Sequence, residues 1–198
     1  MSRSGPPVIV GYDPGWPLLA GELLGQLRGA VPDCAWVFEH IGSTSVPGLA
    51  AKNIIDLQIR VPELPSYRFL DERFGPLGYR RARGSRPDSP GVDRDADRGS
   101  ERAAAEVLAK RLYWRDGLPP VILHVRRLDS PFGRNTVWFR DWLRAHDAER
   151  DRYAQVKRQL AAAHAANADF DDYTRAKTAY LDEVQSSFED WARRVGSQ

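Results

Sequence analysis

The sequence has little cysteine, no long apolar run and no large excess of one charge, and each of these absences excludes a class of protein. The single cysteine, Cys34, allows no internal disulfide framework and no metal site built from several cysteines. It has no evident basic neighbour, so we expect an inert thiol. No apolar run approaches the roughly 18 residues that a membrane helix needs. Residues 1–7 hold one arginine and no apolar core, so we expect no signal peptide and a cytoplasmic location.

The charges are mixed in sign and nearly balanced. Charged residues make up 28% of the chain and the formal net charge is +2, whereas a protein dedicated to nucleic acid is usually much more basic. We therefore expect no nucleic-acid partner. A local cluster of arginines is followed by aspartates that nearly cancel its charge: Arg80, Arg81, Arg83, Arg86, Asp88, Asp93, Asp95 and Asp97.

The segment Arg83–Ser100 is dense in Gly, Pro, Ser, Asp and Arg and has almost no apolar residues. Such a composition is typical of a mobile loop. We expect this segment to act as a lid over a cleft.

Apolar spacing predicts strands in the first two thirds of the chain and helices in the last third. Turn signals at Asp13–Trp16 introduce a helical run of leucines, which ends at Gly29–Asp33. Strands are expected over 35–41, 54–61, 77–81, 111–114 and 121–125, and further helices over 64–74, 101–108, 132–145, 147–166 and 171–195. The prediction is an α+β fold, with an α/β core over 1–130 and a helical part over 131–198 packed on it as one unit.

The turn Gly42–Gly48 is the first candidate site. Gly42 lets the backbone turn after a strand without a Cβ clash, and three hydroxyl residues follow it, Ser43, Thr44 and Ser45. We expect Ser43 or Ser45 to cap a short helix over Val46–Ala51, with Pro47 near its first position. Free N–H groups at a helix start, together with hydroxyls and with Lys52 one short turn later, predict a site for a phosphate or another anion.

The strand after this turn alternates in polarity. Ile55, Leu57 and Ile59 share one face, while Asp56 and Gln58 share the other. Two carboxylates alternating on a strand would hold two divalent ions for phosphoryl transfer. Here the second position is an amide, whose oxygen can still ligate a hard cation such as Mg²⁺ but carries no charge. An aspartate on the polar face of a strand is, on the other reading, simply solvated or salt-bridged.

Taken together, these motifs resemble the GrpB family, which is characterised by one block: His-Ile-Gly-Ser-Thr-Ser-Val-Pro-Gly-Leu, a lysine and Ile-Asp. The chain carries it as His40–Leu49, Lys52 and Ile55-Asp56. The likeness extends over nearly the whole chain, and its separate motifs occur in the same order along the sequence. It includes Tyr12–Pro17, Leu123-His124-Val125, Phe139–Arg144, Tyr153 with Lys157, and Tyr173 with Lys177.

The resemblance implies a nucleotidyltransferase-like fold of the DNA polymerase beta type: a small mixed β-sheet flanked by helices, with C-terminal helices. In that superfamily a Gly-Ser pair precedes Asp-x-Asp by about a dozen residues, as Gly42-Ser43 precedes Asp56 here. The chain departs from the pattern at Gln58, which stands in place of the second acid, and at Asn53, where the family usually has proline. The later strand, which normally supplies a third acid, offers His124 and Arg126 instead.

Other candidate residues come from the later strand and the C-terminal helices. His124 is either a hydrogen-bonded core residue or, facing Asp56, a base or metal ligand. Arg140, Lys157 and Lys177 either lie on solvated helix surfaces or close over the site and contact an anion. For Arg140, a structural salt bridge with Asp141 is a further alternative. Tyr153 and Tyr173 lie on apolar helical stripes and are expected in the core.

Two hypotheses remain for the function. In the first, the protein is an enzyme that binds a nucleotide such as ATP at Gly42–Ser45 and transfers a nucleotidyl or phosphoryl group. Asp56, with Gln58 and His124, would hold Mg²⁺, and the phosphates would be neutralised by Lys52, Arg126, Arg140, Lys157 and Lys177. In the second, the same pocket is a repurposed scaffold that binds a small anionic metabolite or carries a metal-independent reaction, with His124 and Asp56 as acid and base.

Overall fold

The structure, a computed structural model, describes residues 7–31, 35–84, 89, 91–97, 103–167 and 171–196. Within them the chain forms a sheet and a set of helices. The strands are β1 (Val37–Ile41), β2 (Ile55–Val61), β3 (Arg80–Arg81), β4 (Lys110–Arg115) and β5 (Val121–Arg127). The helices are α1 (Gly15–Gly29), α2 (Tyr67–Phe74), α3 (Ala105–Leu108), α4 (Pro131–Ala145), α5 (Asp147–Ala163) and α6 (Asp171–Gly196), with 3-10 turns η1 (Ser43–Ser45) and η2 (Gly75–Leu77).

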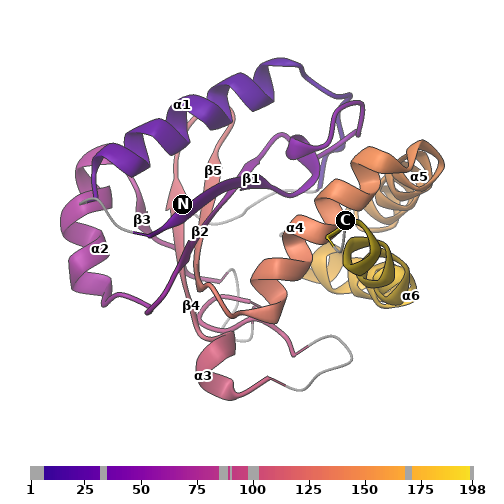
Figure 1. Ribbon diagram of the computed structural model, residues 1–198. Helices are drawn as coiled ribbons and strands as arrows, with labels where there is room; N and C mark the ends of the chain where they lie inside the picture. The colour runs from indigo at the N-terminus through magenta and orange to yellow at the C-terminus, as the bar shows by residue number, and fades with distance from the viewer. Residues whose placement is uncertain are drawn as a thin grey trace.

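The described strands form one mixed sheet in the order β1-β2-β5-β4-β3. The central strands β2 and β5 are parallel, with Gln58 opposite His124, and the other pairs are antiparallel. Helices α1 and α2 cover one side of this sheet, and α4, α5 and α6 lie on the other side (Figure 1). The predicted α+β architecture is therefore confirmed, and it is consistent with a nucleotidyltransferase-like fold.

The side under α1 and α2 is the main hydrophobic core. On α1, Trp16, Ala20, Leu23 and Leu27 recur at helical spacing and are all buried. They pack against the alternate β2 residues Ile55, Leu57, Ile59 and Val61 and against Leu123 and Val125 of β5. Each buried Leu, Ile or Val side chain of this set contributes about 1.5–3 kcal/mol when it leaves water. The predicted alternation of β2 is confirmed, because Asp56 and Gln58 point to the opposite side.

The C-terminal helices form a second apolar cluster. Trp142 and Leu143 of α4, Tyr153 of α5, and Tyr180 and Phe188 of α6 are buried in it, and the Tyr153 and Tyr180 rings stack with centroids 4.9 Å apart. Val46, Leu49 and Ala50, which follow η1, belong to the same cluster. The helical part therefore packs directly on the loop that carries the candidate site. No described helix is both long enough and apolar enough to cross a bilayer.

Two local predictions were wrong. No helix forms over Val46–Ala51; a 3-10 turn over Ser43–Ser45 takes its place, and Ala51 instead forms an antiparallel bridge with Val10. The prediction that the whole of 83–100 is a mobile loop also fails at Asp93–Asp95. Their backbone is hydrogen-bonded to Lys110 and Leu108, and Asp95 is 4% exposed.

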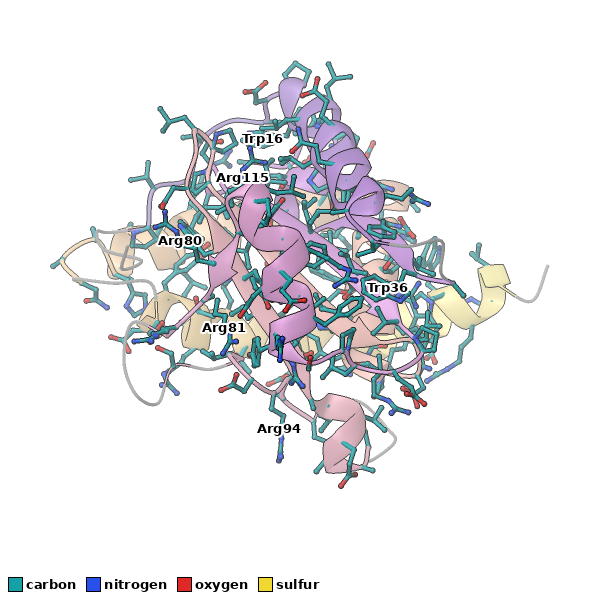
Figure 2. The ribbon with its side chains drawn as sticks, turned by 90° about the vertical axis from the view of Figure 1, so that its left-hand side faces the viewer. Trp16, Trp36, Arg80, Arg81, Arg94 and Arg115 are labelled. Atoms are coloured by element: carbon teal, nitrogen blue, oxygen red, sulfur yellow. The ribbon has the colours of Figure 1, made fainter. Side chains whose placement is uncertain are left out.

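In the structure, part of the arginine cluster of the sequence is paired with an acid of a neighbouring helix. Arg81 is paired with Asp71 on α2 through two hydrogen bonds to Oδ2, at 2.9 and 2.5 Å. Arg80 and Arg81 lie beside α2, whereas Arg94 lies near α3, further along the molecule (Figure 2). The other predicted members Arg86 and Asp88 lie outside the described residues.

Candidate functional site

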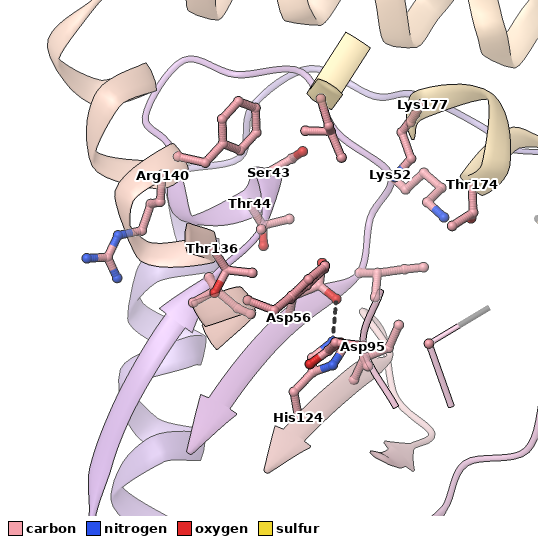
Figure 3. A pocket seen from close by; sticks show the side chains of 18 of the residues that line it. Ser43, Thr44, Lys52, Asp56, Asp95, His124, Thr136, Arg140, Thr174 and Lys177 are labelled. Carbon is pink, nitrogen blue, oxygen red and sulfur yellow. Dashed lines mark ion pairs between the residues drawn. The ribbon is translucent and has the colours of Figure 1, made fainter. Parts of the chain in front are cut away.

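A cavity of about 670 Å³ lies between the polar face of the sheet and the C-terminal helices. Every element around it contributes a side chain. Among these are Ser43 and Thr44 of η1, Asp56 of β2, His124 of β5, Phe139 of α4, Tyr153 of α5 and Lys177 of α6 (Figure 3). Residues from distant parts of the sequence thus meet at one place, as the family resemblance implies.

The turn at Gly42 brings the backbone against the Asp56 carboxylate. Gly42 has a φ of 70°, and a Cβ there would lie 2.5 Å from Asp56 Oδ2 and 2.9 Å from its Cβ. Only glycine avoids this collision. The Ser45 hydroxyl closes the turn by donating to the Gly42 carbonyl at 2.5 Å, and Ser45 does not line the cavity. The predicted anion-binding role of Ser45 is therefore replaced by a structural one, while Ser43 and Thr44 face the cavity.

Neighbouring side chains fix the hydroxyls of the turn. The Thr44 hydroxyl lies 3.0 Å from His40 Nε2, and the Ser43 side chain lies close to the Tyr153 hydroxyl. Burial, together with the nearby Arg144 and Arg140 guanidinium groups, lowers the pKa of His40 to about 4. His40 is therefore a neutral ring at physiological pH that holds the turn in place.

Asp56 and His124 form the reactive pair of the cavity. His124 Nε2 lies 3.9 Å from Asp56 Oδ1 (Figure 3). On the other side of the ring, Nδ1 lies 3.1 Å from Arg126 Nη2 and 3.4 Å from Lys110 Nζ. Guanidinium and ammonium groups can only donate hydrogen bonds, so Nδ1 must accept. We therefore assign the imidazole as neutral, with its proton on Nε2 directed towards Asp56.

A buried acid, Asp95, holds the two cations behind His124. Its Oδ2 accepts from Arg126 Nε at 2.6 Å, and its Oδ1 accepts from Lys110 Nζ at 2.8 Å and from Arg126 Nη2 at 3.1 Å. Burial alone would raise the pKa of Asp95, but Arg126 and Lys110 outweigh it and keep that pKa below its ordinary value. Asp95 and Lys110 were not predicted as site residues; Lys110 lies opposite Arg126 in the register of β4 and β5, one residue before the strand predicted over 111–114.

Gln58 has no free lone pair for a metal ion. Its amide oxygen accepts from Arg126 Nη1 at 2.6 Å and from Thr136 Oγ1 at 3.2 Å, and its amide nitrogen donates to Glu39 and to the Gly133 carbonyl. It is fully buried and does not line the cavity. We therefore do not retain Gln58 as a catalytic or metal-binding residue. The anion-binding role predicted for Arg126 is also dropped, because its guanidinium is taken up by Asp95, Gln58 and His124.

The residues present do not fit a two-ion centre. Asp56 is the one carboxylate of the pattern on β2, and both lone pairs of the Gln58 oxygen are used. The described residues contain no group of three His, Cys, Asp or Glu side chains close enough together to hold a metal ion. The position behind His124 is already filled by the positive charges of Arg126 and Lys110. The arrangement therefore does not provide the ligands of a two-ion Mg²⁺ centre.

The other end of the cavity is basic. Lys52 Nζ lies 5.2 Å and Lys177 Nζ 5.1 Å from the centroid of the Tyr173 ring. Lys157 is 2% exposed, donates to the Ala50 carbonyl, and lies over the Tyr153 ring at 4.7 Å. Tyr153 and Tyr173 are buried, as predicted, but they also form part of the cavity wall.

Lys157 carries the clearest electrostatic sign of an anion site. Burial, together with the like charges of Lys177, Arg158 and Lys52, lowers the pKa of Lys157 to about 6. An anion among these groups would offset that repulsion. Arg140 differs, because it forms a two-point salt bridge with Asp141 and donates to the His40 carbonyl at 3.0 Å, and its guanidinium points away from Asp56 (Figure 3).

The fold and the site are those of an α+β protein whose polar cavity lies under C-terminal helices, and they are consistent with a nucleotidyltransferase-like architecture. The family model described as "GrpB protein" matches residues 6–187. The chain therefore belongs to the GrpB family. The crystal structure of conserved protein GrpB from Enterococcus faecalis superposes with a TM-score of 0.70 at 25% identity, covering 93% of this chain and 99% of that one.

Curated relatives fall into two groups of different length. UPF0157 protein BH1888 of Halalkalibacterium halodurans is 31% identical over 153 residues, which is 77% of this chain and 68% of that protein. The dephospho-CoA kinase of Mycolicibacterium paratuberculosis is 30% identical over 194 residues, 95% of this chain but 47% of the kinase. The chain thus spans about half the length of the dephospho-CoA kinases that it matches.

Proposed function

We propose that the cavity binds a small anionic molecule, such as a phosphorylated metabolite or a nucleotide, without a divalent metal ion. The observation that carries this proposal is the convergence of Lys52, Lys157 and Lys177 on one cavity, where burial and mutual repulsion lower the pKa of Lys157 to about 6. An anionic group bound there gains the two cations Lys52 and Lys177, and it relieves the repulsion that disfavours the protonated form of Lys157. Ser43 and Thr44 add hydroxyl groups to the lining of the same cavity.

The Asp56–His124 pair gives the bound molecule a place for acid–base chemistry. Asp56 would accept a proton from a hydroxyl or ammonium group of the ligand, and the Nε2–H of His124 would donate to the charge that develops. Asp95 holds His124 in the tautomer that this role needs, through Arg126 and Lys110. This arrangement favours the metal-independent alternative over nucleotidyl transfer.

Nucleotidyl or phosphoryl transfer is a second candidate, supported by one observation. The Gly42-Ser43 turn lies directly against Asp56, which is the arrangement that the resemblance implies for such enzymes. Kinase activity of the type named for the longer relatives is not proposed, because the chain contains no Gly-Lys dipeptide and so no Walker A loop.

Thermal unfolding with added anions tests the proposal. Pyrophosphate, a sugar phosphate and the four nucleoside triphosphates would each be added with and without Mg²⁺. We expect at least one to raise the melting temperature without Mg²⁺, since a ligand at 100 times its Kd adds about 2.7 kcal/mol to the free energy of unfolding. Lys177→Ala should weaken the effect, whereas Arg194→Ala, which removes an exposed cation from the same helix, should not.

Three outcomes would decide against it. If no anion shifts the melting temperature, the cavity is not an anion site. An unchanged shift in Lys177→Ala would place the bound anion elsewhere on the protein. A shift that appears only with a nucleotide and Mg²⁺ together, and that Asp56→Asn abolishes, would favour nucleotidyl transfer instead.

A further inference from the structure

The lysines of this protein are confined to the cavity. The chain has four, Lys52, Lys110, Lys157 and Lys177, and its other cations among 29 Lys and Arg residues are arginines. All four lysines line the cavity. Lysine and arginine side chains both carry a positive charge, but only lysine can lose its proton near neutral pH and become a nucleophile. The confinement therefore indicates that the cavity uses a property of lysine that arginine lacks.

The surroundings of the four amines differ, and they single out Lys157. Lys110 is paired with the Asp95 carboxylate at 2.8 Å, which favours its charged form. Lys52 and Lys177 are half-buried at the wall of the cavity, near the Tyr173 ring. Lys157 is 2% exposed, and its Nζ donates a hydrogen bond to a neutral group, the carbonyl of Ala50.

The groups that face Lys157 favour its neutral form. Lys52 comes from the loop before β2, Lys177 from α6 and Arg158 from its own helix, and all three are cations that add to the effect of burial in lowering its pKa. The Tyr153 ring, 4.7 Å from Nζ, supplies an apolar wall whose hydroxyl has a raised pKa because it is buried. The pKa of Lys157 is about 6, so most Lys157 side chains are free amines at pH 7. Burial beside other cations is the arrangement that activates lysine for attack on carbonyl groups.

We propose that Lys157 is a nucleophile that forms an imine with the carbonyl carbon of an anionic aldehyde or ketone bound in the cavity. This proposal rests on the proposed function, because Lys52 and Lys177 hold the anionic group of the substrate. The Nζ lone pair forms the new C–N bond while the carbonyl π electrons move to oxygen. Both amine hydrogens then leave with that oxygen as water, which completes the C=N bond without any oxidant or reductant.

Pyridoxal 5′-phosphate, an aldehyde with a phosphate group, is a suitable probe. The full-length protein would be incubated with it, reduced with borohydride to trap any imine, and mapped by peptide mass spectrometry. We expect one predominant adduct, on Lys157, and protection by excess inorganic phosphate. Lys157→Arg, which keeps a long basic side chain but cannot form an imine, should lose the adduct, whereas Lys177→Arg should retain an adduct on Lys157.

The rate of imine trapping should increase with pH, because only the unprotonated amine of Lys157 reacts. Trapping is expected to rise as the pH passes through the pKa of about 6, as the amine loses its proton. An ordinary lysine would instead require a pH near its pKa of about 10.4. Because bound phosphate raises the pKa of Lys157, a high phosphate concentration should move the midpoint upwards.

Pyridoxamine 5′-phosphate separates this proposal from the proposed function, because it has the phosphate but no carbonyl. If it raises the melting temperature and pyridoxal 5′-phosphate forms no adduct on Lys157, the cavity binds anions but Lys157 is no nucleophile. If neither compound binds, both proposals fail. Trapping on Lys52 or Lys177 in preference to Lys157 would also overturn the inference. The wild-type adduct map and pH profile distinguish these outcomes even if Lys157→Arg does not fold.

Discussion

The two faces of strand β2 show how one short segment serves both stability and function. On one face, Ile55, Leu57 and Ile59 are completely buried under α1 and α2. On the other, Asp56 faces a cavity and Gln58 belongs to a buried polar network. The first face needs only shape and apolar area, whereas the second needs a partner for every polar atom. The site therefore depends on distant residues in a way that the core does not.

Breaking the buried polar network should lower the free energy of unfolding more than the other changes described below. Asp95→Asn removes the negative charge that Asp95 places against the buried Arg126 and Lys110, and we expect a loss of about 3–5 kcal/mol in the free energy of unfolding, measured with urea at pH 7. Because the pKa of Asp95 is lowered in the fold, its contribution is present above about pH 4 and is lost as the pH falls below that value. The variant should therefore be less sensitive to acid.

Asp190→Asn is the matched control for this change, since Asp190 forms an exposed ion pair with Arg193. Its effect should stay within about 1 kcal/mol. Equal stability of Asp95→Asn and Asp190→Asn would mean that the buried network does not support the fold.

A substitution that leaves a cavity in the apolar face should lower the free energy of unfolding slightly less, and it should leave anion binding unchanged. Leu57→Ala removes a fully buried side chain at the centre of the sheet, with an expected loss of about 2–5 kcal/mol. Leu18→Ala, on the exposed side of α1, should change stability little. Anion binding per folded molecule should be the same in both variants. A specific loss of affinity in Leu57→Ala would show that the two faces are not independent.

The smallest change in stability, with a clear effect on the site, is expected for Gly42→Ala. The Gly42 backbone, with φ 70° and ψ −172°, lies in a region essentially restricted to glycine, which costs about 1–3 kcal/mol for a residue with a Cβ, and that Cβ would displace the Asp56 carboxylate. Gly21→Ala is the control, because its Cβ would have nothing within 4 Å and alanine favours a helix by up to about 1 kcal/mol. Calorimetric titration with the best phosphate ligand should find weaker binding in Gly42→Ala alone. Unchanged affinity would contradict the placement of the ligand beside Asp56.

The sequence was informative where a pattern repeats and silent where a contact is formed between distant segments. Alternation in β2 predicted which side chains face the cavity side of the sheet, and the apolar period predicted the long helix α6 to within a residue at its C-terminal end. Asp95 could not be recognised, because neighbouring aspartates in the same polar segment look equivalent until the fold pairs one of them with Arg126. Gln58 was misread for a similar reason: its lone pairs are taken by Arg126 and by Thr136, 78 residues away.

The protonation state of the four lysines tests most directly the central claim that the cavity is an anion site. With ¹³C-labelled lysine, NMR would follow each Cε signal as a function of pH, before and after addition of a phosphorylated ligand, with Lys157→Arg assigning the signal of Lys157. We predict that Lys157 titrates with a pKa of about 6, and that the ligand raises this pKa and shifts the signals of Lys52 and Lys177. If all four lysines titrate near their ordinary value of about 10.4 and no anion shifts any of them, the cavity is not the anion site proposed for this protein.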